Sequence, residues 1–119
     1  MLTEMKALFN INYSLMKTLF SHPNFSDLEK TLVENNPETL RHGEAHIQSF
    51  PDGWPNITIE NVKRDVEHKD VTYIADFSEP KNFFSNYAMI RVLVDYYADK
   101  VRVIVPYFPV GTMERISKK

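Results

Sequence analysis

The stretch between residues 71 and 105 most constrains the fold, because it reads as a strand, a helix and a second strand. Residues 71–76 and 101–105 are short runs rich in β-branched side chains, which are typical of strands. Between them, apolar side chains recur at helical spacing from Phe83 to Tyr97. Two strands joined by a crossover helix pair in parallel through a right-handed connection. The pattern predicts an α/β fold in which these two strands are adjacent or near-adjacent.

The intervening helix is expected over residues 80–98, with one face buried against the sheet. Its apolar stripe is better explained as core than as a platform for a ligand. The members of the stripe are Phe83, Phe84, Tyr87, Ile90, Val94 and Tyr97. We expect Phe84, Tyr87 and Val94 to pack on the sheet. Polar groups that follow the two strands should meet at the carboxyl edge of the sheet.

Shorter signals predict the remaining strands. Residues 14–20 could continue an amino-terminal helix or form a first strand, and the break that follows at 21–24 favours the strand. Residues 45–50 alternate weakly between apolar and polar side chains, and residues 56–60 alternate cleanly, which indicates two further strands. The polar run 63–70 is interpreted as a solvated connection.

Capping patterns predict how two helices begin. Ser26 and Glu29 have the spacing of a capping box, so a helix is expected over 27–35. Ser78 is a candidate cap for the later helix, and Pro80 suits its first turn. The buried stripe predicted for the earlier helix consists of Leu28, Leu32 and Val33.

Composition narrows the function classes. A chain of 119 residues with 43% hydrophobic and 25% charged residues is suited to one globular domain. The net charge of −2 gives no electrostatic case for binding nucleic acid or a membrane surface. There are no cysteines, which excludes disulfides and thiolate chemistry. Glu4 lies where a signal peptide would be basic, so a cytoplasmic location is expected.

Known phosphate-binding and metal-binding patterns are absent from the sequence. It contains neither a Gly-x-Gly-x-x-Gly nor a Walker A motif. His42, Glu44 and His46 offer two imidazoles and a carboxylate, but Gly43 disfavours the helix that would place them on one face. No metal ligand and no catalytic residue is therefore assigned. His22 and His68 are interpreted as surface residues.

Two proline-rich loops offer chemistry of their own. A turn that carries Phe50, Asp52 and Trp54 can present an aromatic face and a carboxylate to a purine base, although a tight turn with an aromatic plug explains it too. The loop after residue 105 contains Gly111 and Arg115, and an arginine there can clamp a phosphate or be a plain surface residue.

These two loops resemble segments of the ribose-phosphate diphosphokinase family, also called phosphoribosyl pyrophosphate synthetases. Residues 50–53 followed by the Asn-Ile-Thr-Ile strand resemble the family's adenine-contacting loop. Residues 52–56 and the run Pro-Tyr-Phe-Pro-Val-Gly-Thr-Met-Glu-Arg at 106–115 are similar to motifs of its divergent plant-like class. The turn at 76–80 also fits the family's strand-to-helix turn. The resemblance covers residues 15–119 and leaves 1–14 as an amino-terminal extension.

The resemblance implies a fold, a reaction and a set of binding residues. The fold is a three-layer parallel-sheet domain of phosphoribosyltransferase type, Rossmann-like and here truncated. The reaction transfers the diphosphoryl group of ATP to ribose 5-phosphate with Mg²⁺, in homo-oligomers that serve nucleotide biosynthesis. The residues implied to face ATP are Phe50, Asp52, Trp54, Gly111, Thr112, Glu114 and Arg115.

The resemblance also shows departures from the family pattern. Ordinary members have glutamate at the position of Trp54, and an Arg-Gln pair at those of Thr112 and Met113. The family's catalytic histidine loop and its ribose-phosphate loop, which carries the Asp-Asp signature, would lie beyond Lys119. We therefore expect this chain to be the amino-terminal, ATP-facing portion of such an enzyme and to be inactive alone. The residues that would bind Mg²⁺ cannot be identified in its sequence. The alternative is a non-catalytic regulatory or scaffolding homologue of the enzyme.

Overall fold

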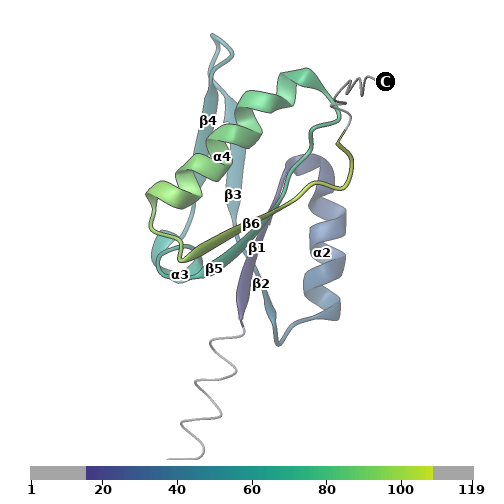
Figure 1. Cartoon of the computed structure of the whole chain (residues 1–119), viewed down its shortest axis with the longest axis vertical. Helices are drawn as coiled ribbons and strands as arrows, with labels where there is room; N and C mark the ends of the chain where they lie inside the picture. The colour runs from purple at the N-terminus through teal and green to yellow at the C-terminus, as the bar shows by residue number, and fades with distance from the viewer. Residues whose placement is uncertain (1–15, 109–119) are drawn as a thin grey trace, which may run out of the picture.

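The computed structural model describes residues 16–108, which form a parallel sheet with helices on both faces and a separate hairpin (Figure 1). The sheet has the strand order β2-β1-β5-β6, and each neighbouring pair is parallel. Its strands are β1 (Lys17–Ser21), β2 (Leu40–His42), β5 (Asp70–Ile74) and β6 (Lys100–Ile104). The predicted α/β class is confirmed, and β5 and β6 are adjacent and parallel as the sequence indicated.

The helices connect the strands in two crossovers that run in opposite directions. α2 (Ser26–Asn35) links β1 to β2, and α4 (Phe83–Asp95) links β5 to β6. Because both crossovers are right-handed, the two helices cover opposite faces of the sheet. Two 3₁₀ turns, η1 (Pro23–Phe25) and η2 (Pro80–Asn82), precede α2 and α4. In the part of the chain that the structure describes, no helix is long and apolar enough to cross a membrane.

The strands β3 (Ala45–Ser49) and β4 (Pro55–Ile59) form an antiparallel hairpin that stands beside α4 (Figure 1). Ile47 pairs with Ile57 in the register, and both pack against the core from the same side as α4. Both strands were expected from the sequence, at nearly these bounds.

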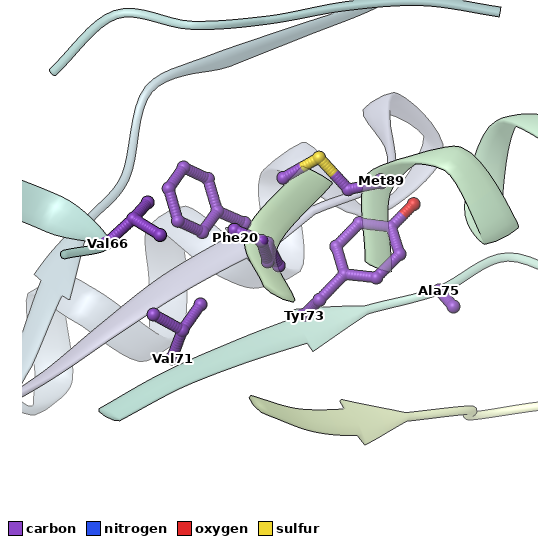
Figure 2. Close-up of a cluster of buried hydrophobic side chains, with 7 residues drawn as sticks. Phe20, Val66, Val71, Tyr73, Ala75 and Met89 are labelled. Carbon is purple, nitrogen blue, oxygen red and sulfur yellow. The ribbon is translucent and has the colours of Figure 1, made fainter. Parts of the chain in front are cut away.

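The core lies between the sheet and α4. Phe20 of β1 pairs in register with Tyr73 of β5, and both belong to one buried cluster, in which the Tyr73 ring points toward Met89 of α4 and the Phe20 ring toward Val66 (Figure 2). All residues of β5 from Val71 onward are buried, because β5 lies between β1 and β6 and packs its Val71 and Tyr73 in the core with α4. This central position accounts for the burial of the strand that the sequence predicted over residues 71–76.

The predicted buried face of α4 is wrong. Its buried residues are Asn86, Met89 and Leu93, whereas Phe84 and Tyr87 are 58% and 60% exposed. Phe83 and Val94 are likewise exposed, and Ile90 of the same stripe is half-buried. The reason lies in Asn86, whose amide is needed inside to bond Tyr73 Oη and the Asp76 carbonyl. That bonding turns the side of the helix that carries Asn86, Met89 and Leu93 toward the sheet.

The capping predictions also fail, although both helices exist. The residue before α2 is Phe25, which makes no side-chain cap, and Glu29 turns inward to accept a hydrogen bond from Ser21. Leu28 is exposed, while Leu32 and Val33 are half-buried.

At the second helix, Pro80 begins η2 as expected, but Ser78 does not cap it. The Ser78 N–H instead donates to the Asp76 carboxylate at 2.9 Å. This bond ties the backbone after β5 to a buried side chain, so the helix begins later than the sequence suggested.

The run 63–70 is not merely a solvated connection. It overlaps the short helix α3 (Val62–Asp65), which Asn61 caps by accepting from Arg64 N–H. Asp65 is buried because Arg64 pairs with both of its carboxylate oxygens, at 2.7 and 2.8 Å, and Val66 joins the core. Nothing in the sequence indicated this burial, because Asp65 and its partner Arg64 both lie in a run of polar residues.

Candidate functional site

The tip of the β3–β4 hairpin is a closed turn that holds the predicted aromatic and acidic residues together. Phe50 N–H donates to Trp54 O at 2.8 Å, and Gly53 N–H donates to Phe50 O at 2.8 Å. Gly53 has a φ of 92°, a left-handed conformation that favours glycine. Asp52 Oδ1 accepts from Trp54 N–H at 3.2 Å, which fixes the carboxylate inside the turn.

The aromatic side chains of this tip remain open to solvent. Phe50 is 49% exposed and Trp54 is 63% exposed. Trp54 is not free, however, because its ring meets the edge of Phe84 at a centroid distance of 6.0 Å. The tip therefore presents aromatic surface beside a carboxylate, which can stack on a base and accept a hydrogen bond from an exocyclic amine.

A chain of edge-to-face aromatic contacts leads from the tip toward the segment after β6. Phe84 contacts Phe83 at 5.8 Å between centroids, Phe83 contacts Phe77 at 6.2 Å, and Phe77 contacts Phe108 at 6.0 Å. The sequence analysis missed these contacts because it assigned Phe83 and Phe84 to the core. The only feature of the sequence that could have indicated these contacts is the high density of aromatic residues. Gly111, Thr112, Glu114 and Arg115 lie outside the described residues.

A second polar cluster lies where β1 and β5 end. The sequence predicted polar groups after β5 at this edge of the sheet, but it did not predict that His22, Asn24 and Asn82 would join them. Asp76 is 5% exposed, and its Oδ2 accepts from Asn24 Nδ2 at 2.6 Å and from Asn82 Nδ2 at 3.5 Å. Hydrogen bonds from Ser78 and Asn24 hold the pKa of Asp76 below its ordinary value. This cluster therefore keeps a carboxylate ionised inside the protein.

His22 belongs to the same cluster, so its interpretation as a surface residue is wrong. It is 8% exposed, because it follows β1 directly and its backbone N–H donates to Ile74 O. Its Nδ1 accepts from Asn24 N–H at 3.2 Å and lies 4.0 Å from Asp76 Oδ2. Burial lowers the pKa of His22, and the nearby Asp76 only partly offsets this. His68 is exposed, as expected.

The remaining histidines point to different partners. His42 Nδ1 lies 3.2 Å from Glu29 Oε1, and His46 Nε2 lies 2.7 Å from Glu60 Oε1. Within residues 16–108, no group of three histidine or acidic side chains is arranged to hold a metal ion.

The fold and the site together define a class: an α/β domain with an open parallel sheet, polar groups at its carboxyl edge, and an aromatic and acidic hairpin beside it. Residues 16–119 match the family model described as the N-terminal domain of ribose phosphate pyrophosphokinase. The chain belongs to this family, which confirms the resemblance drawn from its loops.

Curated relatives carry the same family name at low identity. The chain is 29% identical over 87 residues to ribose-phosphate pyrophosphokinase 4 of Oryza sativa subsp. japonica, covering 73% of this chain and 26% of the relative. It is 26% identical over 108 residues to ribose-phosphate pyrophosphokinase 3, mitochondrial, of Spinacia oleracea, covering 91% and 26%. It is 33% identical over 112 residues to ribose-phosphate pyrophosphokinase of Fusobacterium nucleatum, covering 91% and 33%. The chain thus spans about a quarter to a third of the length of these relatives.

Proposed function

We propose that this chain is the ATP-facing amino-terminal portion of a ribose-phosphate pyrophosphokinase, acting in nucleotide biosynthesis in the cytoplasm. The complete enzyme would transfer the diphosphoryl group of ATP to ribose 5-phosphate and release AMP. Mg²⁺ would accompany ATP and neutralise phosphate charge, with ligands from outside the described residues. Family membership and the hairpin tip support this proposal.

The observation that carries the proposal is the exposed tip of the hairpin. Two aromatic side chains, Phe50 and Trp54, flank the carboxylate of Asp52 on a turn closed by backbone hydrogen bonds. A preformed turn loses little conformational entropy when it binds a base. Phe50, Asp52 and Trp54 would contact adenine. Gly111, Thr112, Glu114 and Arg115 would lie along the phosphates, with Arg115 making a charge-assisted contact.

Under this proposal, the chain alone does not catalyse the transfer of the diphosphoryl group to ribose 5-phosphate. The match covers the N-terminal domain of the family, and the chain spans only about a quarter to a third of its relatives' length. Purified chain mixed with ATP, Mg²⁺ and ribose 5-phosphate should release no AMP above a control without the sugar phosphate. Release that depends on ribose 5-phosphate would contradict this part of the proposal.

The chain is also proposed to form homo-oligomers. The outward face of α4 carries Phe83, Phe84 and Tyr87, each more than half exposed, beside the exposed Trp54. Exposed apolar surface of this extent is typical of a protein interface. The same surface favours the second candidate function, a non-catalytic homologue that pairs with active subunits. A non-catalytic partner should change the activity of a full-length relative when it is added to it, and this measurement distinguishes the two functions.

An ATP titration followed by Trp54 fluorescence tests the nucleotide site. Trp54 is the only tryptophan, so the signal reports on the tip. We expect binding near the millimolar range, about −4 kcal/mol, because the rest of the enzyme does not close over the nucleotide. Phe50→Ala should weaken binding by loss of stacking, about 1–3 kcal/mol. Arg115→Ala should weaken ATP binding but not adenosine binding.

The control variant is Leu28→Ala, an exposed apolar position on α2. It should bind ATP as the wild type does. An equal response in the wild type, Phe50→Ala and Arg115→Ala, or no response at millimolar ATP, would overturn the assignment of the site.

A further inference from the structure

Beside the polar cluster at the ends of β1 and β5 lies a cavity of about 370 Å³, which His22 and Asn82 of that cluster line and which extends to Gly53 of the hairpin tip. Its walls come from the loop after β1, the end of β3, the start of β4 and the beginning of α4. The lining includes His22, Ser49, Gly53, Pro55, Asn82 and Phe84. Its volume lies within the range of about 300–1,000 Å³ that is typical of small-molecule sites.

The position of the cavity in the topology favours a binding site. The chain leaves β1 toward β2 on one side of the sheet and leaves β5 toward β6 on the other. The strand order therefore reverses between β1 and β5, and in open α/β sheets ligands bind outside the carboxyl ends of the strands at this point. His22 follows β1, and Asn82 caps α4 after β5, so both lie at this switch point.

Two nearly buried side chains at the cavity each have an unpaired polar atom. His22 and Asn82 are each 8% exposed. His22 Nδ1 accepts from Asn24 N–H, so in the uncharged ring Nε2 carries the proton and has no partner among the described residues. Asn82 Nδ2 donates to Asp76, and Asn82 Oδ1 has no partner there either.

These two atoms can reach a ligand, because they are not sealed by protein. Neither atom is among the fully enclosed side-chain nitrogen and oxygen atoms that lack a hydrogen bond in the described part of the chain. The cavity therefore offers one hydrogen-bond donor, His22 Nε2–H, and one acceptor, Asn82 Oδ1. Buried polar groups of this kind favour a ligand that satisfies both, since each unmade hydrogen bond costs free energy.

The charges around the cavity disfavour an ionic ligand. Asp76 of the same polar cluster is ionised, and its oxygens already accept hydrogen bonds from Ser78, Asn24 and Asn82. Its negative charge would repel a phosphate, and the three donors already bound leave its oxygens little capacity for a cation. Lys81 at the rim is itself paired with Glu79 at 3.0 Å. Phe84 and Pro55 supply an apolar wall.

We propose that this cavity binds an uncharged ligand with a flat face and an edge that both donates and accepts hydrogen bonds, the chemistry of a nucleoside base. The base edge would accept from His22 Nε2–H and donate to Asn82 Oδ1, with the ring against Phe84. This site adjoins the tip through Gly53, but Phe50, Asp52 and Trp54, which are proposed to contact the adenine of ATP, do not line it.

The imidazole signals of His22 in NMR spectra test the proposal, with adenosine as the probe. Adenosine should shift the His22 signals in a saturable way and leave those of the exposed His68 unchanged. Ser49→Phe, which places a large side chain at the cavity wall, should abolish the shift. Thr58→Phe, an exposed position on the same hairpin that does not line the cavity, should preserve it.

Two further comparisons separate this site from the tip and define its ligand class. Phe50→Ala should leave the shift of His22 unchanged, even if it abolishes ATP binding at the tip. Inorganic phosphate should produce no shift at the same concentration. The proposal is overturned if adenosine leaves His22 unmoved, if Phe50→Ala or Thr58→Phe removes the shift, if Ser49→Phe retains it, or if phosphate reproduces it.

Discussion

At the scale of single residues, position 43 requires glycine because Phe20 leaves no room for a side chain there. A Cβ atom added to Gly43 would lie 2.5 Å from the Phe20 ring, which is 1% exposed and cannot move away within a packed core. Gly43→Ala should therefore lower the free energy of unfolding by about 1–3 kcal/mol. Urea denaturation of the two proteins measures this difference.

The matched control for this prediction is the same substitution in a Phe20→Leu background. Leucine removes the ring atoms that the new methyl group would meet, so Gly43→Ala should cost clearly less there. Equal losses in both backgrounds would show that the ring contact is not the cause.

Glu29 makes stability depend on pH through its burial. The carboxyl group is 5% exposed, and burial raises its pKa above the ordinary value of 4.5 despite hydrogen bonds from Ser21 and His42. A raised pKa in the folded state means that the folded protein binds more protons than the unfolded chain. The stability that Glu29 contributes is thus full below pH 4.5 and is lost as the pH rises through the folded-state pKa.

Glu29→Gln removes this titration while its amide can still bond Ser21. The free energy of unfolding of Glu29→Gln, relative to wild type, should therefore rise as the pH increases from 4.5 toward neutrality. Urea denaturation at a series of pH values measures the difference. A difference that stays constant over this range would show that Glu29 titrates normally in the folded state.

At the scale of elements, α4 provides a direct comparison of its two faces. Leu93 is fully buried, whereas the adjacent Val94 is 50% exposed. Leu93→Ala should lower the free energy of unfolding by about 2–5 kcal/mol, because it leaves a cavity in the core. Val94→Ala should change it by no more than about 0.5 kcal/mol. Thermal or denaturant unfolding of both variants checks this, and similar losses would support the face predicted from the sequence.

The same helix shows how far the sequence determines the elements. The type and order of β5, α4 and β6 follow from local apolar patterns, and the structure confirms them. The buried face does not follow, because both faces of α4 carry apolar residues and periodicity alone cannot choose between them. The choice is made by Asn86, whose buried amide bonds Tyr73 and Asp76 from another element. Such a tertiary contact has no local signal.

At the scale of the whole molecule, the two candidate sites differ in how predictable they were. The hairpin tip is contiguous in sequence, so its aromatic and acidic residues could be recognised together. The cavity at the switch point is built from His22 and Asn82, which approach only after β1 and β5 pair in parallel. His22 was interpreted as a surface residue because a polar loop gives no sign that a neighbouring strand will cover it.

The exposed aromatic face of α4 leads to a prediction about the assembly of the whole molecule. Trp54, Phe83, Phe84 and Tyr87 line an open groove of about 570 Å³, and apolar surface of this kind gains free energy when a second copy covers it. We expect the wild-type chain to self-associate at high micromolar concentration, as measured by sedimentation velocity. Tyr87→Glu should shift the protein toward monomer, because association would then bury an unpaired charge. Leu28→Glu, an exposed apolar position on the opposite helix, should associate as the wild type does. A monomeric wild type, or equal effects of the two substitutions, would contradict an interface on this face.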